Sequence, residues 1–152
     1  MDKRIYTIGS SLRGIEEFLQ LLQQYRIESL IDVRSFPSSR LPHFCQEELE
    51  ASLSASDIKY IYLGKELGGF RSGGYERHMQ TDIFKQGLDK LEPIALSGCC
   101  AIMCAERFPW RCHRRFISLA LQERGWQVIH IIDSERIWQP KTPYKRIEKQ
   151  GG

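Results

Sequence analysis

The sequence predicts an α/β fold, namely a mainly parallel five-stranded sheet with helices on both faces, in a single domain. Short apolar runs alternate with segments of helical periodicity along most of the chain, and parallel strands need such crossover connections. The length of 152 residues suits one domain with its own core. We expect residues 1–133 to form this domain and residues 134–152 to form a polar, basic tail.

Five apolar runs have the length and composition of buried strands. They comprise residues 5–8, 29–33, 58–63, 101–104 and 128–132. Four segments between or beside them place apolar residues at helical spacing, such as Leu49 and Leu53 in the second. These segments comprise residues 15–22, 47–55, 79–91 and 112–124.

Capping and breaking residues mark where these helices begin and end. Ser10 or Ser11 is suited to cap the first helix, Pro93 is expected to end the third, and Gly125 closes the fourth. Residues 64–77 contain five glycines and no apolar period. This composition predicts a long loop of the kind that often covers a site.

The composition is that of a globular protein, with 41% hydrophobic and 27% charged residues, and it excludes a disordered chain. The net charge of +3 is too small to indicate nucleic-acid binding by itself. No apolar run is long enough for a membrane span, and the first residues carry no signal region. Five cysteines in such a chain favour a cytoplasmic protein with reduced cysteines over a disulfide scaffold.

Polar side chains gather where the predicted strands end. Ser10 follows the first strand, Asp32 and Arg34 end the second, and Cys104 and Glu106 end the fourth. Ligands of open parallel sheets bind beyond these carboxyl ends, so we expect the residues at one edge of the sheet. Asp32 and Arg34 alternate on one face, where they form either a plain ion pair or a positioned fork for an anion.

Residues 104–115 lead from the fourth strand into the fourth helix and carry the strongest signal for an anion site. No Ser, Thr, Asp or Asn caps this helix, and Arg111 and Arg114 flank its start, which suits a phosphate, sulfate or carboxylate. Glu106 is the competing partner for the helix N–H groups. Arg71 and Tyr75, in the glycine-rich segment, are further candidates for contacts with a small anionic ligand.

Cys112 is the candidate nucleophile, because a helix start beside arginines lowers the pKa of a thiol. Cys104 is the second candidate, and Glu106 or Asp32 would carry protons. His113 is placed in the same helical turn as Cys112 and points elsewhere, so we expect it near the anion rather than in a direct Cys–His pair. Packing in the core is the alternative for every cysteine. The spacing of Cys and His does not suggest zinc, and we expect no metal or cofactor.

Several motifs resemble the domain-of-unknown-function family 488 over nearly the whole chain. They are Thr7-Ile8-Gly9, the segment 32–37 around Asp-Val-Arg, Leu67-Gly68-Gly69, Tyr75 with Met79, and Met103 to Glu106 leading to Cys112-His113-Arg114. The resemblance implies a small α/β domain of bacteria and archaea with an unassigned polar cleft. The matching positions are Asp32, Arg34, Cys104, Glu106, Cys112, His113 and Arg114. The family usually has His after Thr-Ile-Gly, whereas this chain has Ser10.

These observations lead to three hypotheses about function. The first is a cytosolic enzyme, a thiol- or carboxylate-dependent hydrolase or transferase, that acts on a small anionic or nucleotide-like substrate. The second is a nucleic-acid-associated module that uses the Arg-rich helix and the tail, where Trp138 and Tyr144 could stack on bases. The third is a sulfurtransferase-like enzyme, suggested by the cysteines and by a short likeness of the Asp-Val-Arg strand end to rhodanese-like domains.

Overall fold

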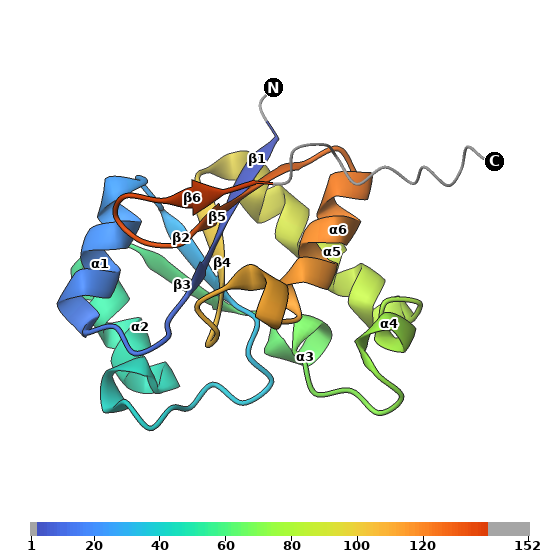
Figure 1. Cartoon of the computed structure of the whole chain (residues 1–152), viewed down its shortest axis with the longest axis horizontal. Coiled ribbons are helices and arrows are strands. Elements are labelled where there is room, and N and C mark those ends of the chain that lie inside the picture. Colours follow the sequence, from blue (N-terminus) through green and yellow to red (C-terminus); the bar gives the residue numbers. More distant parts are fainter. Residues whose placement is uncertain (1–2, 140–152) are drawn as a thin grey trace.

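Five parallel strands and one short antiparallel strand form the sheet in the computed structural model, which describes residues 3–139 (Figure 1). The strand order is β3-β2-β4-β1-β5-β6. The strands are β1 (Arg4–Gly9), β2 (Ser29–Asp32), β3 (Lys59–Tyr62), β4 (Cys100–Cys104), β5 (Gln127–Ile131) and β6 (Ile137–Trp138). The α/β class and the mainly parallel sheet are therefore confirmed.

Strand β6 is a strand that the sequence did not predict, and it makes the predicted five strands six in the described residues. It lies within the segment that was expected to be a tail and pairs antiparallel with β5, with Trp138 opposite His130. A strand of two exposed residues shows no alternation that a sequence pattern could detect.

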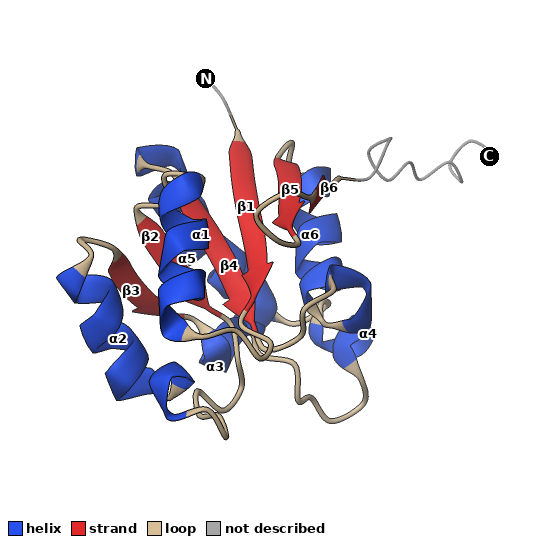
Figure 2. Cartoon of the chain, turned by 60° about the vertical axis from the view of Figure 1, so that its left-hand side comes forward, coloured by secondary structure: helices blue, strands red, loops and turns tan. Residues whose placement is uncertain are grey.

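Helices cover both faces of the sheet (Figure 2). Helices α1 (Ile15–Gln24) and α2 (Gln46–Ala55) pack on one face, whereas α5 (Asp82–Ser97) and α6 (Arg114–Glu123) pack on the other. The short α3 (Gly64–Leu67) and α4 (Tyr75–His78) lie with α5 and α6. The 3-10 helices are η1 (Pro42–Phe44) and η2 (Pro109–Arg111).

Strand β4 runs through the middle of the sheet and is buried along its whole length. Successive side chains of a strand point to opposite faces. Ala101 and Met103 accordingly join the core under α1 and α2, whereas Cys100, Ile102 and Cys104 join the core under α5 and α6. The last residue of β4, Cys104, therefore faces the side of the sheet on which α6 begins.

Helix α5 differs from its prediction at both ends. It begins at Asp82 because the Thr81 side chain accepts a hydrogen bond from the N–H of Phe84, and it continues to Ser97 past Pro93. A proline inside a helix removes one backbone hydrogen bond, which favours a break. Here the turn beyond it buries Ala95, and the adjacent Glu92 accepts a hydrogen bond from the indole of Trp126, so packing outweighs the local preference.

Helix α6 begins two residues later than predicted, at Arg114, and η2 precedes it. Cys112 has extended backbone angles and lies between the two helices instead of within a helical turn. The predicted caps of α1 were also wrong, because Gly14 precedes that helix and the backbone N–H groups of Ser10 and Ser11 bond the carbonyls of Cys104 and Ala105. The expected loop at 64–77 contains the single-turn helices α3 and α4.

The carboxyl ends of the parallel strands meet the loops shown at the bottom of Figure 2. From β2 the chain crosses to β3 on one side, and from the neighbouring β4 it crosses to β5 on the other, so a topological switch point lies between β2 and β4. On the other side of β4, the turn after β1 packs tightly against the segment that follows β4, because a Cβ on Gly9 would collide with the backbone of Glu106 and Arg107. Space for a ligand is left on the β2 side of β4. No helix in residues 3–139 is long and apolar enough to cross a membrane.

Candidate functional site

A pocket of about 450 Å³ opens at the carboxyl edge of the sheet, between the loops that follow β2 and β4. Its walls come from the loop after β2, the loop after α3, the end of β4 and the segment between η2 and α6. The lining residues are Arg34, Ser35, Phe36, Ser38, Gly69, Phe70, Cys104, Ala105, Glu106, Arg111, Cys112 and His113. The structure thus brings six of the residues singled out from the sequence into one pocket.

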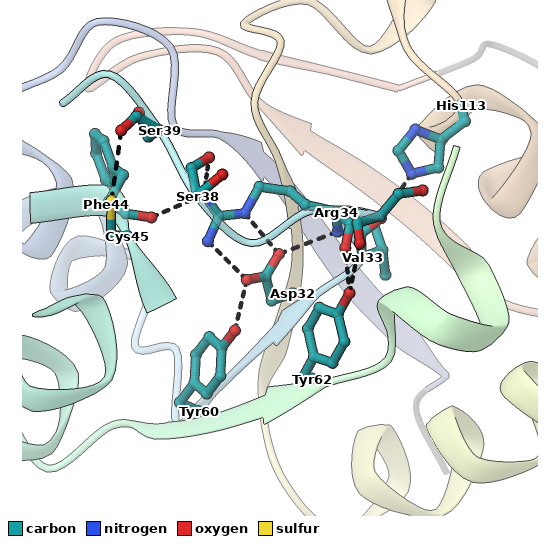
Figure 3. A network of polar contacts seen from close by, with 11 residues as sticks. Asp32, Val33, Arg34, Ser38, Ser39, Phe44, Cys45, Tyr60, Tyr62 and His113 are labelled. Atoms are coloured by element: carbon teal, nitrogen blue, oxygen red, sulfur yellow. Dashed lines mark hydrogen bonds and ion pairs between the residues drawn. The ribbon is translucent and has the colours of Figure 1, made fainter. Parts of the chain in front are cut away.

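Asp32 and Arg34 form a buried bidentate ion pair at the end of β2 (Figure 3). The Nε and Nη2 atoms of Arg34 donate to the two carboxylate oxygens of Asp32 at 2.9 and 2.8 Å, and the Tyr60 hydroxyl donates to Asp32 Oδ2 at 2.6 Å. Burial by itself lowers the pKa of Arg34, but the bonds and charge of Asp32 outweigh it and raise that pKa. The plain ion pair is therefore the arrangement observed.

The Nη1 group of Arg34 and the carbonyl of Arg34 tie the strand end to neighbouring segments. The Nη1 atom donates to the carbonyl of Phe44 at 2.8 Å, and the Tyr62 hydroxyl donates to the carbonyl of Arg34 at 2.7 Å. The network holds the loop after β2 in place, so that Arg34 lines the pocket while its guanidinium bonds the chain itself. Asp32 is fully buried and does not line the pocket.

The sulfur atoms of Cys104 and Cys112 lie at disulfide distance from one another, whereas Cys45, Cys99 and Cys100 are free. The expectation of reduced cysteines is therefore not confirmed for this pair. Strand alternation turns Cys104 toward α6, and the segment before α6 brings Cys112 back over the end of β4. Both residues line the pocket. Cys104 is buried, whereas Cys112 is half-buried.

His113 lies beside Cys112 with its imidazole held in one orientation. Its Nε2 atom is 2.9 Å from the carbonyl oxygen of Val33, and its Nδ1 atom is 3.5 Å from Cys112 Sγ. A carbonyl only accepts, so Nε2 carries the proton and the neutral ring presents a lone pair at Nδ1. Gly69 allows the loop to pass against the ring, because a Cβ there would lie 2.8 Å from Nδ1. Burial lowers the pKa of His113, opposed by the bond to Val33.

The expectation that Cys112 and His113 do not meet was wrong. Neighbours in an α-helix project about 100° apart, which is the basis of that expectation. Because both residues precede α6 and Cys112 is extended, the thiol and the imidazole can face one another.

The N–H groups at the start of α6 are bonded within the chain. The N–H of Arg114 donates to Cys112 Sγ at 3.3 Å, and the N–H groups of Arg115 and Phe116 donate to the carbonyls of Cys112 and His113. The Cys112 sulfur thus accepts the hydrogen bond of the first N–H group of α6, and two nearby carbonyls accept those of the next two.

Arg114 is fully buried and binds the chain instead of lining the pocket. Its Nη1 atom donates to Thr7 Oγ1 at 2.9 Å and its Nη2 atom donates to the carbonyl of Glu106 at 2.8 Å. Burial lowers the pKa of Arg114 to about 9, and the charge of Arg13 contributes. Thr7 Oγ1 in turn lies 2.6 Å from Nδ1 of His130. Hydrogen bonds therefore connect Arg114, Thr7 and His130 inside the protein.

Three other predicted residues lie outside the pocket. Ser10 is buried against Cys104, and Arg71 donates to the carbonyls of Gly68 and Lys65 at the end of α3. The Tyr75 hydroxyl donates to the carbonyl of Leu67 at 2.8 Å, while its ring lies 5.4 Å from that of His113. The ring of Tyr75 therefore packs against the imidazole of His113.

Residues that the sequence analysis did not select complete the rim of the pocket. Phe36 is 66% exposed and Phe70 is 76% exposed, with ring centroids 5.4 Å apart. Ser35 Oγ accepts a hydrogen bond from the N–H of Phe70, which joins the two loops. The sequence carried only a weak signal that these aromatic residues belong to the pocket, because the exposure of a loop side chain depends on how the loop folds.

The structure describes part of the set of residues that suggested nucleic acid. Arg114 is buried, Trp138 packs against Trp110 and His130, and Tyr144 lies outside the described residues. Within residues 3–139 no group of three or more His, Cys, Asp and Glu side chains is placed to hold a metal ion.

Comparison with known proteins gives one match, to a family model. The model described as "Domain of unknown function DUF488" matches residues 14–121. Searches against curated proteins and against solved structures find no match. The matched segment runs from just before α1 into α6, includes every residue that lines the pocket, and covers more than two thirds of the chain. The protein therefore belongs to the DUF488 family.

Proposed function

We propose that the protein is a thiol-dependent enzyme in which Cys112 is the nucleophile, His113 is its base, and the pocket holds a small anionic substrate. The observation that carries this proposal is the approach of His113 Nδ1 to within 3.5 Å of Cys112 Sγ, with Nε2 held by Val33. A nucleophilic thiol needs an adjacent base whose orientation is set by a third group. In the reduced protein, the proton of the Cys112 thiol passes to Nδ1.

The surroundings of Cys112 favour its thiolate. The N–H of Arg114 points at the sulfur from the start of α6, and the buried charge of Arg114 lowers the pKa of His113 in addition to burial. A neutral imidazole at neutral pH is the form that can accept a proton. Arg111 is exposed on the pocket wall and supplies the positive charge for an anionic substrate group.

We expect iodoacetamide to alkylate Cys112 of the reduced protein faster than Cys99 or Cys100 near neutral pH. Burial raises the pKa of Cys99 and raises that of Cys100 to about 12, so both are held as thiols. The His113→Gln variant keeps a donor for the Val33 carbonyl but lacks the base, and we expect its Cys112 rate to fall about tenfold or more. Mass-spectrometric mapping of the labelled peptides measures each rate. Labelling of Cys112 that is no faster than that of Cys100 would exclude it as the nucleophile.

The charge of the pocket is tested by comparing iodoacetate with iodoacetamide, two reagents of similar size that differ in charge. We expect Arg111→Gln to reduce the ratio of the iodoacetate rate to the iodoacetamide rate at Cys112 by about threefold or more, because one nearby positive charge is lost. Arg26→Gln is the matched control, since exposed Arg26 precedes β2 at the opposite edge of the sheet. An equal change in both variants would mean that net charge, and not Arg111 in the pocket, sets the ratio.

A further inference from the structure

We propose that the protein reduces small anionic disulfides, with Cys112 as the attacking thiol and Cys104 as the thiol that completes the reaction. The inference rests on the proposed function, because it requires Cys112 to be the nucleophile. The structure brings the sulfur atoms of these two cysteines to disulfide distance within the pocket. A disulfide between two protein thiols is the product left after they have reduced a substrate disulfide.

The two cysteines differ in ways that set the order of attack. Both cysteines line the pocket, but Cys104 is 2% exposed, whereas Cys112 is half-buried. The sulfur of Cys112 has a base in His113 and an N–H donor in Arg114, whereas that of Cys104 is 3.9 Å from the carbonyl of Glu106, a group that only accepts. Cys112 therefore attacks the substrate first, and Cys104 then attacks the mixed disulfide that forms on Cys112.

The fold keeps Cys104 in reach of Cys112 throughout such a reaction. Cys104 ends the central strand β4, where its backbone pairs with Gly9 of β1 and its neighbour Met103 pairs with Asp32 of β2. Cys112 lies eight residues further on, in the segment between η2 and α6. One sulfur is on the sheet and the other is on the segment before α6. The disulfide between them can therefore form and break without a change in strand pairing.

The reaction consists of two thiol–disulfide exchanges. In the first, the Cys112 thiolate attacks one sulfur of the substrate RS–SR, an S–S bond forms between Cys112 and SR, and RS⁻ leaves and takes up the proton held by His113. In the second, the Cys104 thiol loses its proton to the departing group and its sulfur attacks Cys112 Sγ. The Cys104–Cys112 disulfide forms and the second RSH leaves. Two protein thiols are oxidised, one substrate disulfide is reduced to two thiols, and an external dithiol restores the protein by the reverse exchanges.

The pocket also indicates the kind of disulfide. Arg111 supplies a positive charge on one wall, and the exposed rings of Phe36 and Phe70 form an apolar rim. Large exposed aromatic side chains beside polar groups are typical of ligand sites. A disulfide that bears a carboxylate next to an apolar or aromatic group fits both features.

The test uses dithiobis-nitrobenzoate, an aromatic disulfide with a carboxylate on each ring, and the full-length reduced protein. After reaction, mass spectrometry of the wild-type protein should show Cys104 and Cys112 joined, with no nitrothiobenzoate on either. In Cys104→Ser and Cys104→Ala, the nitrothiobenzoate should stay on Cys112 as a mixed disulfide. Cys100→Ser is the matched control, because Cys100 lies on the same face of β4 but outside the pocket, and it should behave as wild type.

The possible failures are distinct from one another. A nitrothiobenzoate adduct that persists on Cys112 of the wild-type protein would overturn the role of Cys104 and leave Cys112 as the nucleophile. Absence of an adduct on Cys112 in both Cys104 variants, with circular dichroism matching the wild type, would overturn the proposed function as well. Dithiothreitol should return the oxidised wild-type protein to two free thiols, and failure to do so would also contradict the cycle.

Discussion

Replacing Asp32 with asparagine is expected to lower the free energy of unfolding by about 3–5 kcal/mol, because it leaves the Arg34 charge buried without its carboxylate. Asp32 has no exposed surface, and its oxygens accept bonds from the side chain and the backbone N–H of Arg34 and from Tyr60. An amide supplies a single acceptor oxygen and no charge. Urea denaturation measures the change.

Two further variants separate the charge from the lost hydrogen bonds. Tyr60→Phe removes one hydroxyl from Asp32 and is expected to cost about 1 kcal/mol. Adding Arg34→Gln to Asp32→Asn removes the unpaired charge and should recover part of the loss. An Asp32→Asn variant no less stable than Tyr60→Phe would contradict the assignment of this pair as the main polar contact at the end of β2.

The stability of the protein is expected to fall steeply below pH 6.5 because of His130. Burial, followed by the charge of Arg114, lowers the pKa of His130 to about 3 in the folded state, whereas an unfolded histidine titrates near 6.5. Between these values the unfolded chain binds a proton that the folded protein does not. The contribution is therefore complete above pH 6.5 and is lost as the pH falls, by about 3 kcal/mol at pH 4.

The His130→Asn variant isolates this effect, since asparagine keeps an acceptor near Thr7 but does not titrate. We expect the difference in unfolding free energy between wild type and variant to shrink by about 3 kcal/mol from pH 7 to pH 4. The carboxylates and His113 are common to both proteins and cancel in this difference. Parallel stability curves for the two proteins would show that His130 titrates normally in the folded state.

Much of the architecture could be predicted because it depends on short contiguous patterns. The parallel strands, the four longer helices and the gathering of Asp32, Arg34, Cys104 and Glu106 at one sheet edge all follow from apolar periodicity and from the positions where strands end. Predictions failed where packing overrode a local preference. Pro93 lies inside α5, and η2 separates Cys112 from the helix that it was expected to start.

The sequence by itself determined which residues lie at the carboxyl edge of the sheet and in what order they follow one another along the chain. The tertiary structure decided what each of them does, because hydrogen-bond partners are chosen among residues far apart in the chain. Val33, eighty residues before His113, sets which nitrogen of that ring faces Cys112. Thr7 and Glu106 take the donors of Arg114 that the sequence had assigned to an anion. Only the folded chain brings these atoms within bonding distance, so local pattern could name the residues but not their partners.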